Sequence, residues 1–341
     1  MSTSRSGRME LIKTIEKERN SKLLVYITGD RRRLETKIAT DVFPIFHEHL
    51  SRMGKQERID LFLYSTGGLT IAGYALVNLI REFCKEFNVI IPFKALSCAT
   101  LISLGANEIV MTPMGQLSPI DPSVHHPLAP VIQLPGQPVG QLVPVNVEDV
   151  NAFINLATKE VGLKNEESMT KIFELLATRV HPLVLGAIQR SREQIAFLAS
   201  NLLKYHIKDD GKVRRIVEII SRKRFSHEYI ISRREAKEIL GLNIVEPEGD
   251  LLKNITNLFK IYSEILELDV PYNPEMYLSG SEVTTSEFNR AIIESNGLTH
   301  VFRTIMEIKR VEVPPQPNIP VPTIGYQERI LQEGWILDNN I

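Results

Sequence analysis

Two short turns in the first third of the chain carry residue types that could perform acyl transfer. The first turn, Ser-Thr-Gly-Gly at 65–68, follows the apolar run 59–64, and the second, at 95–100, follows the run 89–93. Each turn comes after a predicted strand and before a predicted helix, so backbone N–H groups of both turns could face one point in space. Such a point suits an oxyanion, and Ser97 in the second turn would expose a nucleophilic hydroxyl beside it.

A purely structural interpretation competes with this chemistry for each turn alone. A Gly-Gly pair after a strand is often only a tight turn, and a serine before a helix is often only a cap. The order and spacing of the two turns favour the functional interpretation. So does the segment 100–111, which has the pattern of a short buried helix followed by a strand, with Asp121 beyond the exit of that strand.

These motifs resemble those of the Clp-fold serine proteinases, the relatives of the Clp protease proteolytic subunit and of signal peptide peptidase A. The most similar branch is the one called serine dehydrogenase proteinase (SDH). The resemblance extends from about residue 23 to residue 245 and rests on segments 61–68, 95–102, 105–111, 118–122 and 226–242.

The resemblance implies an α/β fold of the Clp/crotonase type, with repeated ββα units, a mostly parallel sheet and a helical arm that contacts other subunits. Alternating strand and helix patterns in the first third agree with a parallel sheet. We expect an N-terminal helix, the proteinase domain, a small C-terminal appendage of a helix plus a β-hairpin, and a Pro-rich linker and tail. These segments span residues 1–21, 22–248, 249–313 and 314–341.

Local patterns also predict individual elements. A strand is expected at 22–28, and a helix, interrupted by Pro44, over most of 34–53. Apolar periodicity predicts a long amphipathic helix at 182–205. The Asn-Gly pair at 296–297 is a strong hairpin signal.

The resemblance implies that Ser97 is the nucleophile, and it indicates candidates for the base. Asp121 stands where the Clp subunit has its catalytic histidine, and the SDH branch has the altered order Ser, Asp, His. His227, which stands where the Clp subunit has its acidic residue, is the first candidate for the histidine. His181, just before a predicted helix, is the second, and the histidines at 125–126 also compete.

We expect the backbone N–H groups of Gly68 and Cys98 to stabilise the oxyanion, and loss of one such donor typically lowers the rate about 100-fold or more. A substrate peptide would pair as an added strand along the segment from Gly67 to Leu69. Two departures from the family pattern stand out, because Thr66 replaces a proline and Ala99 replaces a glycine. A positive φ at Ala99 would strain the turn.

Three alternatives remain open. The first is a Ser-Lys dyad peptidase, with Lys159, Lys164 or Lys171 as the base. The second is an acyl-CoA enzyme of the crotonase type, in which Ser97 has no chemical role. The third is a catalytically weakened scaffold that keeps the turns only as architecture.

Composition limits the cofactors and partners. The chain of 341 residues has a formal net charge of −1, which argues against nucleic acid as a partner. Its 2 cysteines form no metal-ligand spacing and favour a reducing, cytoplasmic location. No metal, cofactor or membrane segment is expected. The expected substrates are peptides or unfolded proteins, and the expected assembly is a homo-oligomer.

Overall fold

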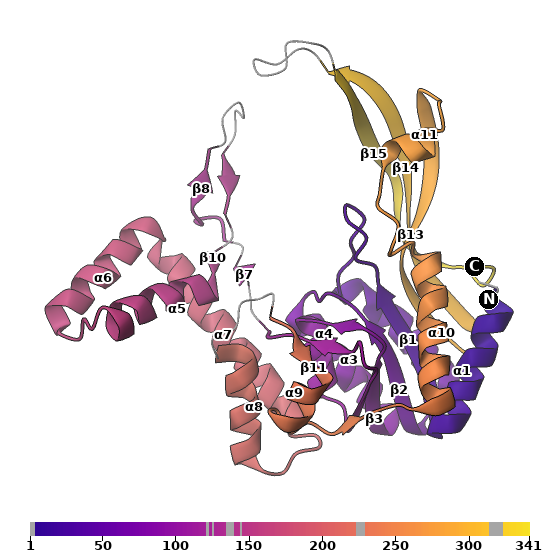
Figure 1. Cartoon of the computed structure of the whole chain (residues 1–341), viewed down its shortest axis with the longest axis horizontal. Helices are drawn as coiled ribbons and strands as arrows, with labels where there is room; N and C mark the ends of the chain where they lie inside the picture. Colours follow the sequence, from indigo (N-terminus) through magenta and orange to yellow (C-terminus); the bar gives the residue numbers. More distant parts are fainter. Residues whose placement is uncertain are drawn as a thin grey trace. The chain divides into compact units, whose positions relative to one another are not determined.

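The computed structural model describes most of the chain, and its described residues fall into two compact units. The described residues are 4–120, 123–124, 126–133, 140–143, 145–222, 229–313 and 323–341. The first unit comprises Met1–Leu117 and Ser232–Ile341, and the second unit comprises Ser118–Ile231. Figure 1 shows the elements of both.

The first unit is built on a mixed sheet of eight strands in the order β12-β5-β3-β2-β1-β13-β14-β15. Neighbouring strands from β12 to β1 are parallel, and the pairs from β1 to β15 are antiparallel. The expected α/β class with a mostly parallel sheet is therefore confirmed. The strands are β1 Lys22–Thr28, β2 Gln56–Tyr64, β3 Cys84–Ile91, β5 Glu108–Met111, β12 Ile244–Val245, β13 Val283–Ser295, β14 Leu298–Val313 and β15 Thr323–Leu337.

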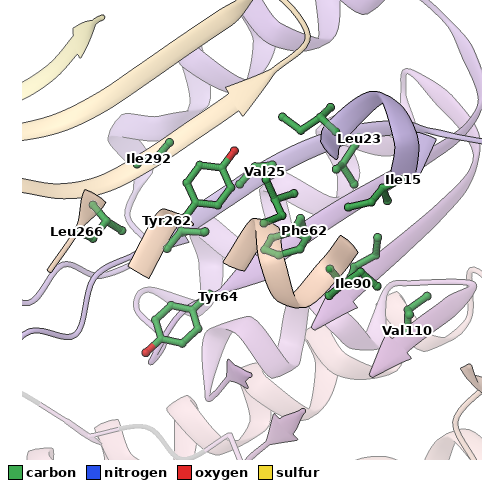
Figure 2. Close-up of a cluster of buried hydrophobic side chains, with 14 of the residues drawn as sticks. Ile15, Leu23, Val25, Phe62, Tyr64, Ile90, Val110, Tyr262, Leu266 and Ile292 are labelled. Carbon is green, nitrogen blue, oxygen red and sulfur yellow. The ribbon is translucent and has the colours of Figure 1, made fainter. Parts of the chain in front are cut away.

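Helices cover both faces of the parallel strands, which explains why these strands are almost continuously apolar. Helices α1 (Arg5–Arg19) and α10 (Gly249–Ile265) lie side by side on one face. Their apolar side chains pack on β1 and β2 in one buried cluster (Figure 2), which includes Ile15, Val25, Phe62 and Tyr262.

Helices α2 (Phe43–Met53) and α3 (Thr70–Arg81) pack against the opposite face. Adjacent side chains of a strand point to opposite faces, so Tyr26 points away from the cluster that contains Val25. The ring of Tyr26 meets Phe46 of α2 edge to face, with ring centroids 5.2 Å apart.

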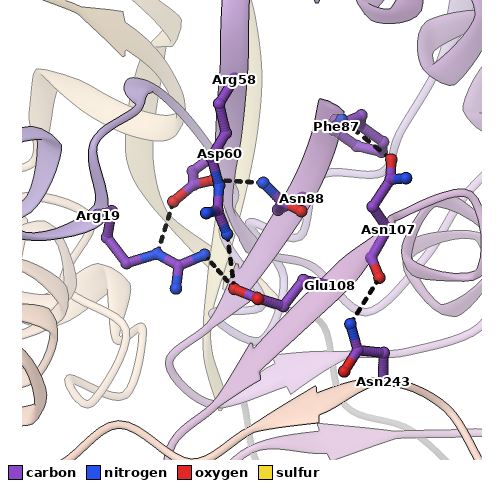
Figure 3. A network of polar contacts seen from close by, with 8 residues as sticks. All are labelled: Arg19, Arg58, Asp60, Phe87, Asn88, Asn107, Glu108 and Asn243. Carbon is purple, nitrogen blue, oxygen red and sulfur yellow. Dashed lines mark hydrogen bonds and ion pairs between the residues drawn. The ribbon is translucent and has the colours of Figure 1, made fainter. Parts of the chain in front are cut away.

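A polar network crosses the parallel strands near their N-terminal ends (Figure 3). Asp60 is fully buried and accepts hydrogen bonds from Arg19 (2.8 Å) and Asn88 (2.9 Å). Glu108 accepts a hydrogen bond from Arg58 at 2.7 Å. Because each charge has a partner, the sheet tolerates these groups in its interior. The turns at 65–68 and 95–100 follow the other ends of β2 and β3.

Short elements connect the large ones in the first unit. Helix α9 begins at a capping box, in which Ser232 and Glu235 bond reciprocally. The shorter elements are η1 Thr40–Val42, β4 Lys94–Ala95, α4 Cys98–Leu104, β6 Gln116–Leu117, β11 Ile231–Ser232 at the boundary of the units, α9 Arg233–Glu238 and α11 Pro274–Leu278.

The second unit is mainly helical after β10 (Val145–Asn146), and it contains the helix predicted at 182–205. The long helix α7 ends two residues before the predicted end at 205. The elements of this unit are β7 Ser123–Val124, β8 Val131–Ile132, β9 Gln141–Leu142, β10 Val145–Asn146, α5 Val147–Asn155, the π-helix η2 Leu156–Glu160, α6 Glu166–Arg179, α7 Pro182–Leu203 and α8 Asp210–Arg222.

The C-terminal third extends the main sheet. The predicted hairpin is present as β13 and β14, and Gly297 between them has φ 100°. Strand β13 pairs directly with β1, so residues 249–313 share a unit with the strands of the expected proteinase domain. The expected tail was wrong for residues 323–337, which form β15 and pair with β14 along its length.

The helix predicted over 34–53 was wrong in its first third. Residues 34–39 have no helical structure, and α2 begins at Phe43 with Pro44 in its first turn. Proline is compatible with that position because the first N–H groups of a helix have no intrahelical acceptor. Segment 34–39 instead pairs with residues far away in the sequence.

Among the described residues, no single helix combines the length and apolarity needed to cross a membrane. Helices α6 and α7 meet that criterion only as a pair, and they are bent by 100° at their junction.

Candidate active site

The first turn holds two glycines in conformations that other residues rarely adopt. Gly67 has φ 113° and Gly68 has φ 155°. A Cβ built on Gly68 would lie 2.1 Å from the carbonyl oxygen of Ile38, so no side chain fits there. Gly68 is therefore required by the close approach of segment 34–39.

The second turn places its strain on the serine itself. Ser97 caps the N-terminus of α4 with φ 52° and ψ −113°, outside the regions that L-residues favour. Strain of this kind costs on the order of 1–3 kcal/mol and is concentrated at functional sites. Ala99 does not have a positive φ, so replacement of the family's glycine there does not strain the turn.

Three sets of contacts bring the two turns together. Ser65 and Ala95 form a parallel bridge, with Leu96 N–H donating to Ser65 O at 2.9 Å. Gly67 lies against Ser97, because a Cβ built on Gly67 would be 2.8 Å from the Ser97 Cβ and 3.2 Å from its Oγ. The two turns, predicted from the sequence to face one point, are therefore neighbours.

The third set of contacts is made by Cys98, whose side chain faces the first turn. Cys98 Sγ lies 3.1 Å from Leu69 O, and a Cβ on Gly73 would be 2.5 Å from the same sulfur. Burial raises the pKa of the Cys98 thiol to about 12. This thiol therefore stays protonated at neutral pH and does not compete with the serine as a nucleophile.

Ile38 engages one side of the first turn. Its N–H donates to Gly67 O at 2.9 Å, and its carbonyl accepts from Leu69 N–H at 2.8 Å. The expected strand addition through Gly67 O and Leu69 N–H is thus already made by the chain itself. Because these two groups point at Ile38, the N–H and C=O of Gly68 point to the opposite side.

Two backbone donors remain at this place. Among the described residues, no acceptor pairs with the N–H of Gly68 or with that of Cys98. The first N–H groups of a helix lack intrahelical acceptors, which accounts for Cys98. Both N–H groups belong to the turns that meet at Ser97.

Side chains of β1, of segment 34–39 and of the turn itself form hydrogen bonds that support the first turn. Ser65 Oγ accepts the Gly67 N–H at 3.0 Å and the Thr28 hydroxyl at 2.7 Å. Lys37 Nζ donates to Thr66 Oγ1 at 2.8 Å. Sequence reasoning missed Thr28, Lys37 and Ile38, because no local pattern marks contacts across such sequence separations.

The predicted base lies mostly outside the described residues. Asp121, His227 and His125 fall in the parts that the structure does not describe. His181 caps α7 in the second unit, where its Nδ1 accepts the Leu183 N–H at 3.2 Å and its side chain is exposed. All of these roles stay predictions.

The alternative lysine bases, Lys159, Lys164 and Lys171, all lie in the second unit. Lys171 is exposed and paired with Glu167 at 2.5 Å within α6, and Lys159 lies in η2 of the same unit. Among the described residues, no group of three or more histidine, cysteine, aspartate or glutamate side chains could hold a metal ion.

Comparison with known proteins identifies the segment that carries both turns. Residues 2–137 match the family model described as ClpP-like SDH-type serine proteinase. The matched segment contains Ser97 and Asp121 and ends before His181 and His227. The family is described as a proteinase, so the match supports a serine peptidase in general.

Two curated relatives of this chain are uncharacterized proteins of Methanocaldococcus jannaschii. One is 26% identical over 210 residues, which are 62% of this chain and 60% of that protein. The other is 34% identical over 76 residues, 22% of this chain and 26% of that protein. The chain therefore matches less than two thirds of the length of either relative.

Two solved structures align with this chain at low identity. A variant of a membrane-bound stomatin-specific protease with a substrate peptide aligns over 63% of this chain and 74% of its own, with 14% identity and a TM-score of 0.37. ClpP1 from Listeria monocytogenes aligns over 70% and 97%, with 16% identity and a TM-score of 0.36.

Proposed function

We propose that the chain is a serine peptidase that hydrolyses peptide bonds with Ser97 as its nucleophile. The observation that carries this proposal is the strained φ of 52° at Ser97, in a turn packed directly against Gly67. A turn of this shape exposes a hydroxyl at the junction of a strand and a helix. The family of residues 2–137 supports the same reaction class.

In the proposed reaction, Ser97 Oγ attacks the peptide carbonyl carbon while its proton passes to the base. The N–H groups of Gly68 and Cys98 donate to the resulting oxyanion. The base then returns the proton to the leaving amine, and water hydrolyses the acyl-enzyme. We propose Asp121 with His227, or with His181, as the acid and base pair.

The wider setting is also a proposal. Peptides or unfolded proteins are the proposed substrates, and they would approach the side of Gly68 that faces away from Ile38. Exposed apolar side chains on α6 and α7, including Phe173, Leu183 and Phe197, support a homo-oligomer joined through the helical arm. Cys84 and Cys98 are both free, which supports a reducing, cytoplasmic compartment.

Labelling by a fluorophosphonate probe tests the nucleophile. We expect the wild type to label and Ser97→Ala to lose labelling completely. Ser51→Ala is the matched control, because Ser51 lies 3.4 Å from His47 on an exposed helix surface without a strained turn. Labelling that persists in Ser97→Ala contradicts the proposal, because another residue then reacts with the probe. Labelling that is absent from the wild type also contradicts it and favours a scaffold or a crotonase-type enzyme.

The base is then chosen by the rate of labelling and of peptide hydrolysis in Asp121→Asn, His227→Gln and His181→Gln. General-base removal lowers the rate by about 100-fold or more. If only Lys159→Met or Lys171→Met reduced the rate, the Ser-Lys dyad would replace the Asp and His pair.

A further inference from the structure

Strands β13, β14 and β15, called the C-terminal sheet below, contact the segment before α2 through a β-bulge in β13. The register between β13 and β14 shifts between Asn289 and Ala291, so Arg290 is the extra residue. Its carbonyl accepts the Gly29 N–H at 2.7 Å and the Thr36 hydroxyl at 2.8 Å. Bulges redirect a side chain that a regular strand would aim elsewhere.

The redirected guanidinium of Arg290 binds the start of segment 34–41. Its Nε donates to Leu34 O at 3.0 Å, and one of its terminal nitrogens donates to Glu35 O. The other terminal nitrogen donates to Thr304 Oγ1 at 3.1 Å and pairs with Glu333 at 2.5 Å. Arg290 thereby connects the sheet to two carbonyls in the non-helical part of the segment, residues 34–39.

The end of the same segment is bound by the last strand of the sheet. Trp335 of β15 donates its Nε1–H to Asp41 Oδ2 at 2.9 Å. The indole is itself positioned by Phe302 of β14, with ring centroids 5.5 Å apart. Segment 34–41 is therefore attached to the C-terminal sheet at both ends.

Polar contacts form much of this attachment, beside the apolar packing of Leu34 against Phe288 and Met306. A cavity of about 220 Å³ lies between the two parts, lined by Thr36, Lys37 and Asp41 on one side and by Phe302 and Trp335 on the other. Since the cavity removes van der Waals contact there, the hydrogen bonds of Arg290 and Trp335 carry a large share of the restraint.

The middle of the segment is what holds the first turn. Ile38 is fully buried, and its two backbone hydrogen bonds bind Gly67 O and Leu69 N–H. We propose that Arg290 is a positioning residue: through segment 34–41, the C-terminal sheet fixes the orientation of the Gly68 N–H that faces the substrate. The catalytic consequence rests on the proposed function, whereas the mechanical linkage does not.

Hydrogen exchange measured by mass spectrometry tests the linkage without any need for activity. In Arg290→Met we expect the amides of Ile38 and Leu69 to exchange about tenfold faster or more, because losing hydrogen bonds to Leu34 and Glu35 frees the segment. Arg303→Met is the matched control. Arg303 lies in the same sheet and pairs with Asp338 at 2.7 Å, but among the described residues it forms no hydrogen bond or ion pair with segment 34–41.

A second variant covers the case in which Arg290→Met does not fold. Trp335→Phe keeps an aromatic ring against Phe302 and deletes only the hydrogen bond to Asp41, so a smaller acceleration, about threefold, is expected at the same two amides. Unchanged exchange at Ile38 and Leu69 in either folded variant overturns the proposal, as does equal acceleration in Arg303→Met.

Labelling rates separate this proposal from the peptidase assignment. If the wild type labels at Ser97, Arg290→Met should label about tenfold more slowly or worse, with Arg303→Met close to wild type. A labelling rate unchanged in Arg290→Met, alongside faster exchange, overturns the positioning role. If the wild type does not label at all, the peptidase proposal fails, and exchange at Ile38 and Leu69 still decides the linkage.

Discussion

Gly67 lies so close to Ser97 that a Cβ added to the glycine would be 2.8 Å from the serine Cβ. Gly67→Ala must therefore displace the serine or the turn, and it also places a side chain at φ 113°. A displacement of about 1 Å at a reacting group lowers the rate about 100-fold. We expect the fluorophosphonate labelling rate of Gly67→Ala to fall by about that factor.

Gly297→Ala is the control that measures the effect of a side chain at positive φ without any clash. Gly297 has a similar φ of 100°, and a Cβ there would meet no atom within 4 Å. This variant should lose some stability and keep its labelling rate. Equal rates for Gly67→Ala and the wild type would show that the contact with Ser97 has no influence on the nucleophile.

The backbone of Ser97 is strained, and this strain predicts which of two substitutions at Ser97 gives the more stable protein. Ser97→Gly relieves the strained φ of 52°, whereas Ser97→Ala retains it. We expect the glycine variant to be more stable than the alanine variant by about 1 kcal/mol, after the greater freedom of glycine in the unfolded chain is subtracted. Urea unfolding measures the difference, and a less stable glycine variant contradicts the strain.

A buried ion pair joins the N-terminal helix to the sheet. The side chains of Arg8 and Glu294 are both fully buried, 2.8 Å apart, and Glu294 also accepts the hydroxyl of Tyr262 at 2.5 Å. Removing one partner leaves the other charge buried without compensation, so Arg8→Ala should lower the free energy of unfolding by about 3–5 kcal/mol.

The control for Arg8→Ala is Arg234→Ala in the exposed pair with Glu238, where the side chains are 82% and 58% exposed. That substitution should change the free energy of unfolding by less than about 1 kcal/mol. Similar urea midpoints for the two variants would be inconsistent with a structural role for the buried pair.

Two buried histidines predict a loss of stability in weak acid. Burial, followed by the positive charges of His300 and Arg52, lowers the pKa of His49 from 6.5 to about 3. Burial also lowers the pKa of His300, despite Glu48 3.6 Å away. His49 Nδ1 lies 2.7 Å from Ser295 Oγ and its Nε2 lies 3.1 Å from His300 Nδ1.

The direction in which stability changes with pH follows from proton uptake by the unfolded chain. Below about pH 6.5 the unfolded chain binds a proton at His49 that the folded chain does not bind until about pH 3, so stability is full above pH 6.5 and falls as the pH drops through this window. Between pH 6.5 and 5 the loss is about 2 kcal/mol for one histidine.

Urea unfolding at pH 7, 6 and 5 measures this slope. His49→Gln should flatten it, whereas His47→Gln, on the exposed side of the same helix, should leave it unchanged. A slope that does not respond to His49→Gln would assign the acid sensitivity to other groups.

Local sequence was sufficient for the parts of the site that lie within one strand-turn-helix unit. The glycine pair at 67–68, the serine at 97 and their flanking strands are each specified by residues a few positions apart. The parallel order of the strands then brings their C-terminal ends together, so the proximity of the two turns could also be predicted. The roles of Asp121, His227 and His181 stay predictions.

The segment before α2 was misread for a physical reason. Residues 34–39 continue a helical pattern, yet the backbone of Ile38 pairs with Gly67 and Leu69. Arg290 donates to the carbonyls of Leu34 and Glu35, which a helix would need for its own hydrogen bonds. Long-range partners therefore outweighed local propensity.

By itself, the sequence determined the α/β class, the two turns and the residue at which a nucleophile could stand, because these depend on periodicity and on the steric freedom of glycine. Only the tertiary structure decided which side of the first turn is occupied by Ile38, and that the C-terminal strands extend the main sheet. The physical reason is that the hydrogen bonds of Ile38, Arg290 and Trp335 join residues that are distant in the chain, and local patterns carry no record of such partners.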